Sequence, residues 1–318
     1  MHAPDLVVVG QVTIDDVVPA NPGPWTRQIG GSSLYAVAGA RLWLEAGRIG
    51  LVACLGEDYP FDVELLLRHA GLRHIALSTF PGQHLVEWLI YESDGTRRSL
   101  PRNPELLQLG AEGALAPQQP SLQRAVYRNL YDKLLDIAPS ADQVPVAWLP
   151  AAALHLCPQA GNRHRDALNK LRDKVRWISV DPSPHYARVA SVAQLAERLQ
   201  GASALLPSAQ DISSLLHDAE PAAAVRELAR AGFAEVVLKR GSNSILLSND
   251  GVVAEIPAVA VEALDPTGAG DAFCGAYAAC RLIGHKPVEA ARRAAASAAL
   301  VVGCRGVEAA LRLAPPNL

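Results

Sequence analysis

The chain has 318 residues, of which 50% are hydrophobic and 19% charged, with a formal net charge of −3 at pH 7 and an isoelectric point near 6.3. These values are typical of a folded chain with a large core. They argue against a nucleic-acid partner, because phosphate backbones are bound through concentrated Lys and Arg. No segment approaches the apolar run that spans a bilayer, and the first residues lack a signal-peptide pattern. We therefore expect a cytoplasmic protein with no membrane partner.

The chain begins with a continuously apolar, β-branched run over residues 6–10, which predicts a buried parallel strand. Similar runs alternate with stretches whose apolar residues recur at helical spacing. Such alternation predicts an α/β fold with a doubly wound, mostly parallel sheet and helices on both faces. The further predicted strands are 49–55, 152–156, 177–180, 204–206, 236–238, 244–247 and a strand end at 259–261, and the predicted helices are 34–46, 62–70, 162–173, 188–199, 219–231, 272–282 and 290–302.

Residues 84–100 interrupt this alternation. Apolar and polar residues alternate before Asp94 and Gly95, a pair that favours a tight turn, so we expect an antiparallel hairpin. Val86, Trp88 and Ile90 would share one face of its first strand, and that face should cover something apolar.

Residues 109–150 form a second irregular region, in which several prolines surround an amphipathic stretch at 122–137 that predicts a helix. We interpret this region as a surface excursion that covers one edge of the sheet. Tyr127 and Tyr131 lie at helical spacing within it and could equally make an oligomer contact.

The five cysteines are far apart and lie in apolar stretches, which is typical of reduced core residues. The spacing of Cys274 and Cys280 matches no zinc pattern, and the nine histidines form no H-x3-H pair. We therefore expect no metal site built from cysteine or histidine.

The most informative segment, residues 264–273, places a carboxylate directly behind a glycine turn that opens onto a helix of small residues. Gly268 and Gly270 permit backbone angles that let successive N–H groups converge at the helix N-terminus, where the helix dipole also favours an anion such as phosphate. Asp271 is then either a base beside an anion site or a first-turn carboxylate that only stabilises the dipole. The glycine context favours the base.

Residues 265–273 read D-P-T-G-A-G-D-A-F, which resembles the D-x-x-G-A-G-D-x-F signature of the ribokinase (PfkB-type) family of carbohydrate kinases. The resemblance implies that ATP, with Mg2+, phosphorylates a hydroxyl of a small sugar or polyol. Asp271 would be the general base, and the amides of Gly268, Ala269 and Gly270 would stabilise the charge that develops on the transferred phosphoryl group.

The same resemblance implies a single ribokinase-like kinase domain over residues 1–318. A small β-sheet lid would be formed by about 12–18 and 84–100, and 109–150 would be an irregular insertion. Two copies of the chain could associate as a homodimer through the lid.

The acceptor side of the site would come from two N-terminal motifs. Asp15 ends a G-x4-D pattern that resembles the family's strand-end motif, whose Asp accepts hydrogen bonds from sugar hydroxyls; Asp16 follows directly, so the two could be exchanged. Gly31, Ser32 and Tyr35 lie in a segment similar to the family's glycine-glycine turn and following helix. Relatives usually carry Asn where this chain has Tyr35, which therefore either meets an unusual acceptor or packs in the core.

The nucleotide side would come from strand ends downstream. Ser208 and Asp211 stand where the family has the Asn and Glu of P-N-x-x-E, so Asp211 would bind Mg2+ through water, and the two residues could also cap the following helix. Lys239 and Gly241 match the segment beside the nucleotide phosphates. Lys239 replaces the family's usual Thr and either contacts a phosphate or is a solvated turn residue.

Near the C-terminus, the helix at 290–302 and the turn at Gly303 correspond to the part of the family that lines the adenine pocket and a monovalent cation site. Asp265, the first residue of the signature, would contribute to that cation site, so potassium is an expected cofactor.

Three other functions stay open. Arg97, Arg98 and Arg102 could hold a phosphate already present on a sugar phosphate, although most exposed charges are only solvated. A nucleoside kinase of the same fold could stack Tyr35 or Trp88 on a base. A non-catalytic sugar or nucleotide sensor could also have kept the fold.

Overall fold

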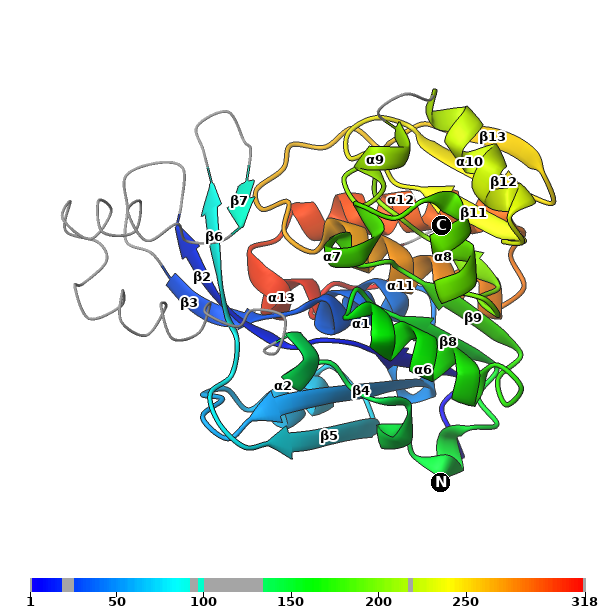
Figure 1. Cartoon of the computed structure of the whole chain (residues 1–318). Helices are drawn as coiled ribbons and strands as arrows, with labels where there is room; N and C mark the ends of the chain where they lie inside the picture. Colours follow the sequence, from blue (N-terminus) through cyan, green and yellow to red (C-terminus); the bar gives the residue numbers. More distant parts are fainter. Residues whose placement is uncertain (1, 19–25, 92–96, 100–133, 217–219, 317–318) are drawn as a thin grey trace.

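The computed structural model describes residues 2–18, 26–91, 97–99, 134–216 and 220–316. A nine-stranded sheet lies at the centre, and a separate four-stranded sheet stands beside it, at the left of Figure 1. In spatial order, the strands of the large sheet are β13 (Val252–Ile256), β12 (Ile245–Asn249), β11 (Glu235–Leu238), β10 (Ala204–Leu205), β9 (Trp177–Val180), β8 (Ala153–Leu156), β1 (Leu6–Val9), β4 (Ile49–Gly56) and β5 (His74–Phe80).

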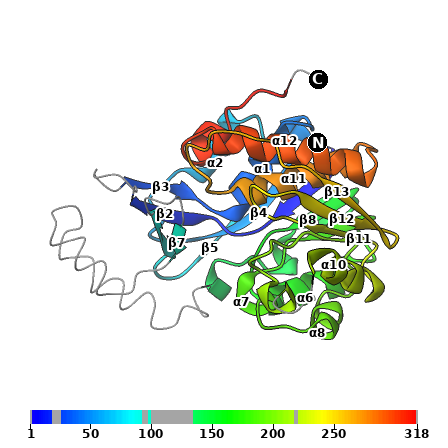
Figure 2. The same cartoon turned by 90° about the horizontal axis from the view of Figure 1, so that it is seen from above.

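The strands from β5 to β11 are parallel, and β12 and β13 add an antiparallel edge. Helices cover both faces of this sheet, as the view from above shows (Figure 2). The structure thus confirms the predicted doubly wound, mostly parallel sheet. Residues of β1 explain why both faces are covered: Leu6 and Val8 pack in one core and Val7 and Val9 in the other, because successive strand residues point to opposite faces.

One face carries α1 (Ser32–Arg41), α2 (Val63–His69), α11 (Ala269–Leu282), α12 (Pro287–Val302) and α13 (Gly306–Ala310). The other face carries α6 (Gly161–Leu171), α7 (Pro184–Ala187), α8 (Val192–Arg198), α9 (Ser213–Leu216) and α10 (Pro221–Arg230). Short 3-10 helices are Ala46–Arg48, Ala141–Gln143 and Val146–Trp148.

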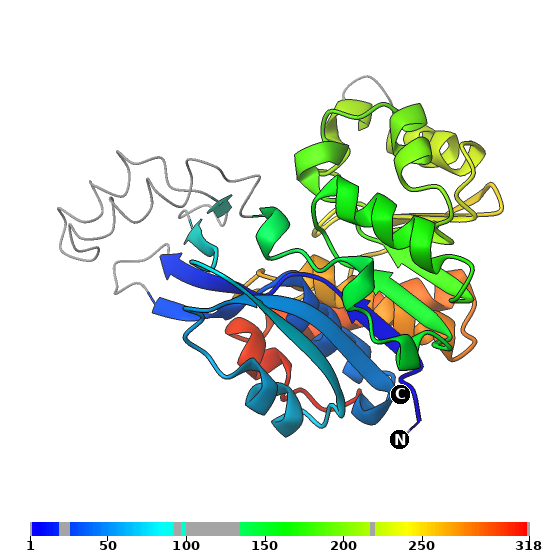
Figure 3. The same cartoon turned by 60° about the horizontal axis from the view of Figure 1, so that its bottom comes forward.

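The smaller sheet has the order β3 (Thr26–Gly30), β2 (Thr13–Val18), β6 (Val86–Tyr91) and β7 (Arg97–Ser99). It lies beyond the carboxyl ends of β4 and β5 (Figures 1 and 3). Both segments predicted to form a lid, 12–18 and 84–100, contribute strands to it. Strand β3 was not predicted, and the expected turn at Asp94 and Gly95 lies outside the described residues.

The fold also corrects several sequence predictions. Residues 259–261 are not a strand: β13 ends at 256, and Val259 and Val261 are about half exposed, each at 48%, with no strand partner. The predicted helix at 188–199 starts too early: residues 188–191 are not helical, and the helix is α8, which begins at Val192, after the separate short helix α7. Strands β5 and β13 were missed.

Some predictions can be judged only in part, because residues 100–133 lie outside the described ranges. Tyr127 and Tyr131 belong to that segment, as do Arg102 and most of the predicted helix at 122–137. Residues 134–136, at its end, are helical.

The cysteines are free thiols, and all but the half-buried Cys304 are buried, as predicted for core residues. Among the helices that the structure describes, none is both long and apolar enough to cross a membrane.

Helices α1 and α11 pack against each other through glycine. Gly39 on α1 lies against the carbonyl oxygen of Ala272, and Gly275 on α11 lies against the carbonyl oxygen of Ala36. A methyl group on either glycine would overlap the opposing backbone. Both positions therefore require glycine for space, and the contact fixes the first turn of α11 relative to α1.

We predict that Gly275→Ala lowers the free energy of unfolding by about 1–3 kcal/mol or more, the cost typical of an overpacked core. The new methyl group can be accommodated only by separating the two helices. The unfolding midpoint in urea would measure this. Gly47→Ala is the matched control, since its methyl group would lie 3.7 Å from the nearest side-chain atoms, those of Arg73. Equal midpoints for the two variants would contradict the proposed close packing.

Candidate active site

Buried polar side chains gather at the carboxyl ends of the parallel strands. Gln11 follows β1, Gln159 follows β8, Asp181 follows β9 and Lys239 follows β11; each is at most 8% exposed. The carboxyl ends of parallel strands meet at one edge, which is where open α/β sheets bind ligands. This edge is therefore the candidate active site.

The glycine turn forms the start of α11. Gly268 is the N-cap residue and adopts a left-handed conformation with φ 73° and ψ 2°, which glycine adopts without strain. Asp265 closes the loop before it: its Oδ1 accepts from the Thr267 amide at 2.9 Å and its Oδ2 from the Gly306 amide at 3.2 Å. Gly270 is exposed and Asp271 is half-buried. The carboxylate predicted to be the base is thus not sealed in the interior.

Tyr35 lies directly against this turn. It stands in the first turn of α1, is 2% exposed, and its ring occupies the space that a side chain on Gly268 would need. The ring also belongs to the core between α1 and the sheet. The structure therefore shows the packing role that the sequence left open, and contact with an acceptor stays a prediction.

Lys239 and Asp181 form a buried ion pair beside the turn. The Lys239 Nζ atom lies 2.5 Å from Asp181 Oδ2 and 3.1 Å from Cys274 Sγ, and it would lie 3.7 Å from a Cβ atom on Gly270. Lys239 is thus not a solvated turn residue. Asp181 was not predicted, although an aspartate directly after the apolar run 177–180 is the signal that could have identified it.

Electrostatics couple this pair to two more carboxylates. Burial raises the pKa of Asp181 to about 7; the Lys239 ammonium opposes this shift, and the carboxylates of Asp211 and Asp271 add to it. Burial would lower the pKa of Lys239, but Asp181, Cys274 and Asp211 outweigh it and raise the pKa, so the amine stays protonated. The site therefore holds a cation among three nearby acids.

Ser208 and Asp211 hold each other at the end of β10. The Ser208 amide donates to Asp211 Oδ2 at 2.7 Å, and the Asp211 amide donates to Ser208 Oγ at 3.2 Å. This reciprocal pair is the local capping role that the sequence offered as an alternative. Ser208 also pairs with Lys239 in a backbone bridge, so the loop lies beside the ion pair.

The donor set fits magnesium only through water. Among the described residues, no group of three or more His, Cys, Asp or Glu side chains is arranged to hold a metal ion. Mg2+ usually keeps several waters and is bound through one or two carboxylates plus substrate phosphates. Oxygen atoms of Asp211 and Asp181 at this edge meet that weaker requirement.

The two acidic residues of β2 have different environments. Asp16 is bound by Arg27 through two hydrogen bonds of 2.7 Å and is fully buried. Asp15 accepts from Thr13 Oγ1 at 2.6 Å, and its carboxylate occupies the space that a side chain on Gly30, just before α1, would need. Asp15 therefore faces the glycine-glycine turn, whereas the carboxylate of Asp16 is bound by Arg27 within the smaller sheet.

The glycine-glycine turn is itself constrained by its surroundings. Gly31 has φ 116°, and a side chain there would overlap the backbone of residues 11–13. Ser32 is the first residue of α1. Tyr59, which sequence reasoning missed, donates from its hydroxyl to the Thr13 carbonyl at 3.1 Å, and burial followed by the nearby Asp15 carboxylate raises its pKa.

Two other predicted residues lie at exposed turns. Gly241 follows Lys239 with φ 62° and has open space at its α-carbon. Gly303 ends α12, and the amides of Leu264 and Asp265 donate to the neighbouring Val302 carbonyl at 2.8 and 3.1 Å. The structure thus brings Asp265 close to Gly303. The side chains of Arg97, Arg98 and Trp88 lie outside the described set.

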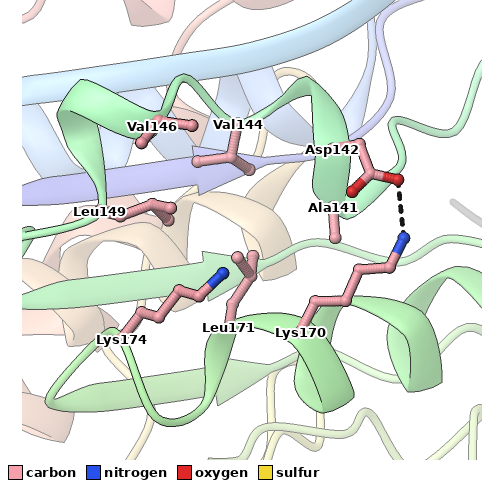
Figure 4. Close-up of a pocket in the computed structure, with 8 residues that line it drawn as sticks. All are labelled: Ala141, Asp142, Val144, Val146, Leu149, Lys170, Leu171 and Lys174. Carbon is pink, nitrogen blue, oxygen red and sulfur yellow. Dashed lines mark hydrogen bonds and ion pairs between the residues drawn. The ribbon is translucent and has the colours of Figure 1, made fainter.

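Two cavities lie away from these residues. A cavity of about 360 Å3 opens between residues 141–149 and the end of α6, where Lys170 pairs with Asp142 at 2.6 Å (Figure 4). The residues that line it come just before β8 and β9 in the chain. The cavity therefore lies at the amino ends of these strands, at the opposite edge of the sheet from Asp271. A second cavity of about 290 Å3 is bordered by Cys54, Phe80 and Arg163 among others. Neither contains a predicted site residue.

A buried histidine anchors the loop after β8. His164 donates from Nε2 to the Cys157 carbonyl at 2.8 Å, so its Nδ1 accepts from the Tyr186 hydroxyl, also at 2.8 Å. Burial lowers the pKa of His164 to about 4. The neutral ring therefore supports the strand end on which Gln159 stands.

Comparison with known proteins gives consistent results. The model of the pfkB family of carbohydrate kinases matches residues 137–313. A cytidine kinase of Thermococcus kodakarensis is 25% identical over 279 residues, covering 86% of this chain and 87% of that protein. A 2-dehydro-3-deoxygluconokinase of Escherichia coli is 42% identical over 81 residues, covering 24% of this chain and 26% of that protein.

The fold is also that of solved ribokinases. An Escherichia coli structure described as ribokinase II, in complex with ATP and Mg2+, superposes with a TM-score of 0.65 at 21% identity, covering 96% of this chain and 94% of that chain. At this identity the likeness shows the fold, including the large sheet with its helices and the smaller separate sheet.

We predict that His164 lowers the free energy of unfolding as the pH falls from 6.5 towards 4, so that the wild type loses more stability over this range than His164→Gln does. In this window His164 binds a proton in the unfolded chain but stays neutral in the folded chain. Protonation therefore favours unfolding, and the loss of free energy of unfolding from His164 reaches about 3 kcal/mol. Urea unfolding at several pH values would measure the slope. His164→Gln should remove the contribution of His164 from the slope, whereas His69→Gln, which changes an exposed histidine on α2, should leave the slope as in the wild type. An unchanged slope in His164→Gln would contradict the prediction.

Proposed function

The chain belongs to the pfkB family of carbohydrate kinases, and we propose that it transfers the γ-phosphoryl group of ATP to a hydroxyl of a small sugar or polyol. At the coarser level the protein is a kinase that acts on a sugar or a nucleoside. One observation carries the finer proposal: Asp271 stands half-exposed in the first turn of α11, directly behind the turn formed by Gly268, Ala269 and Gly270.

In this mechanism Asp271 takes the proton from the acceptor hydroxyl as the hydroxyl oxygen attacks. The amides at the start of α11 stabilise the negative charge on the transferred group, because they have no partner within the helix and lie at the positive end of its dipole. Positioning and charge stabilisation provide most of the catalysis of phosphoryl transfer, since its transition state is loose. Bound ATP supplies the phosphoryl group and the leaving group.

For the nucleotide side, we assign Lys239, Gly241 and Ser208 to the phosphates and Gly303 to the adenine pocket. Asp211 would hold Mg2+ through water, in keeping with a donor set that offers few direct ligands. Two features support this assignment: Lys239 is a cation beside Gly270, and Gly241 leaves open space at its α-carbon.

We assign a monovalent cation, potassium, to the loop of Asp265. Asp265 lies beside the turn at Gly303, where the amides of the loop bind the Val302 carbonyl. This loop precedes the glycine turn, so an ion here would act on the conformation of the turn.

For the acceptor side, we assign Asp15, Gly31 and Ser32, with Tyr35 behind them. The carboxylate of Asp15 can accept from two neighbouring hydroxyls of a polyol. The smaller sheet would then act as a lid that excludes water from the reaction. We place the enzyme in the cytoplasm and its homodimer contact, where one forms, on this sheet.

A nucleoside is the second candidate acceptor. The observation that favours it is the similarity to a cytidine kinase, which extends over 86% of the chain. A nucleoside presents the same ribose hydroxyls to Asp15 and adds a base that would need an aromatic partner. A screen of sugars, polyols and nucleosides with ATP, read by coupled ADP release, separates the two classes.

We predict that Asp271→Asn lowers kcat by about 10²- to 10⁴-fold with little change in the KM for ATP, because the amide keeps the shape of the carboxylate but cannot take a proton. Coupled ADP release measures this. Glu289→Gln is the matched control, because it removes a first-turn carboxylate from α12. Equal activity of the two variants would favour the view that Asp271 only stabilises its helix.

We predict that Asp15→Asn raises the KM for the acceptor by about 10- to 100-fold and leaves the KM for ATP unchanged, because a charge-assisted hydrogen bond to the hydroxyls is lost. Asp16→Asn, on the other side of the same strand, should lower the melting temperature instead, since it breaks the ion pair with Arg27. The opposite pattern would mean that Asp16 is the acceptor ligand.

A further inference from the structure

The ion pair between Lys239 and Asp181 is unusual in its burial. Their side chains are 10% and 3% exposed, and in no other ion pair among the described residues are both side chains this buried. A buried ion pair is a poor source of stability, because desolvation offsets most of the attraction, and apolar residues of similar size often serve as well. The pair therefore calls for a role other than stability.

Both partners keep polar capacity that the protein does not use. The Lys239 ammonium has three N–H donors and, within the described ranges, contacts only Asp181 Oδ2 and Cys274 Sγ. Asp181 Oδ1 is buried and has no hydrogen-bond partner in the part of the chain that the structure describes. Because buried polar atoms are nearly always paired, one unused donor and one unused acceptor at this edge indicate a place for a ligand.

The position of the ammonium matches this expectation. Its nitrogen lies next to Gly270, whose backbone belongs to the first turn of α11. A lysine reaches such a point on a flexible stem of four carbons, so a free Lys239 would occupy many positions. Here the carboxylate at the end of β9 and the thiol of Cys274 on α11 fix it in one.

We propose that Asp181 is a positioning residue: it holds the Lys239 ammonium beside the glycine turn, so that the unused N–H of Lys239 meets an incoming phosphate oxygen. The inference rests on the proposed function, since it concerns the phosphates of the same nucleotide. Asp181 neutralises Lys239 while no phosphate is bound. When phosphate binds, the ammonium is shared between two anions and does not have to move.

The test is a double-mutant cycle with Lys239→Met, Asp181→Asn and both together. Binding of the magnesium complex of a non-hydrolysable ATP analogue is measured by calorimetry. Lys239→Met leaves Asp181 as a buried carboxylate facing the phosphates, so we expect about 10- to 100-fold weaker binding. Adding Asp181→Asn removes that repulsion, and the double variant should bind more tightly than Lys239→Met alone.

Turnover gives the second measurement. Asp181→Asn alone should lower kcat by about 10- to 100-fold, the loss expected when a reacting group is misplaced by about 1 Å, with the acceptor KM unchanged. Combined with Lys239→Met it should cause no further loss, because both changes remove the same fixed charge. A purely structural role would instead give additive losses.

Glu235→Gln is the matched control. Glu235 is a buried carboxylate at the other end of β11, paired with Arg281 at 2.7 Å. Its loss should lower the melting temperature and leave binding of the analogue unchanged.

The outcomes separate the two proposals. Additive effects of Lys239→Met and Asp181→Asn on binding overturn the positioning role, even if the wild type is an active kinase. If the effects of the two substitutions on binding are non-additive but the wild type phosphorylates no acceptor, the positioning role is supported and the proposed function is overturned. Failure of the wild type to bind the analogue overturns both.

Discussion

Helices α1 and α11 approach each other more closely than side chains would allow, because Gly39 and Gly275 leave each backbone in contact with the other. The remaining features of the site depend on this contact. Helix α1 starts at the turn that faces Asp15, and α11 starts at the turn that precedes Asp271. The glycines therefore determine the distance between these two turns, and so between the acceptor side and the phosphate side that we propose. Catalysis by positioning is sensitive to that distance, since a displacement of about 1 Å can reduce a rate 10²-fold.

The charges at the edge of the sheet bear on the magnesium that we propose for the site. Asp181 and Asp211 act on the ammonium of Lys239, and Asp271 acts on Asp181, so three carboxylates lie near one cation and the group as a whole is negative. Polyphosphate would be repelled unless a metal ion accompanied it. An acidic edge thus suits a magnesium–nucleotide complex better than a free nucleotide.

The sequence was sufficient where local signals and tertiary structure agree. The apolar run at 6–10 predicted the buried parallel strand β1, and the motif at 265–273 predicted the glycine turn that opens onto α11. The sequence was insufficient where the pairing with a neighbouring strand determines whether a segment becomes a strand. Residues 259–261 have the β-branched composition of a strand but no neighbour to pair with, whereas β5 contains two polar residues near its end and still pairs with β4 along its length. Asp181 was missed because its role depends on Lys239, which is 58 residues away in the sequence.

Tyr35 shows how one substitution in a motif changes which residues are left to bind an acceptor. Its ring fills the space beside Gly268, so the residue that replaces the family's usual Asn packs against the glycine turn. A buried phenol packed in this way has little freedom to follow an acceptor. We infer that the hydrogen bonds an Asn would make must come from elsewhere, and we assign them to Asp15, whose carboxylate lies at Gly30 of the glycine-glycine turn. Acceptor selection would then lie mainly with the smaller sheet, on β2, while α1 and α11 provide the phosphate chemistry. A change of substrate in such an arrangement requires changes in the smaller sheet and leaves the packing of the two helices intact.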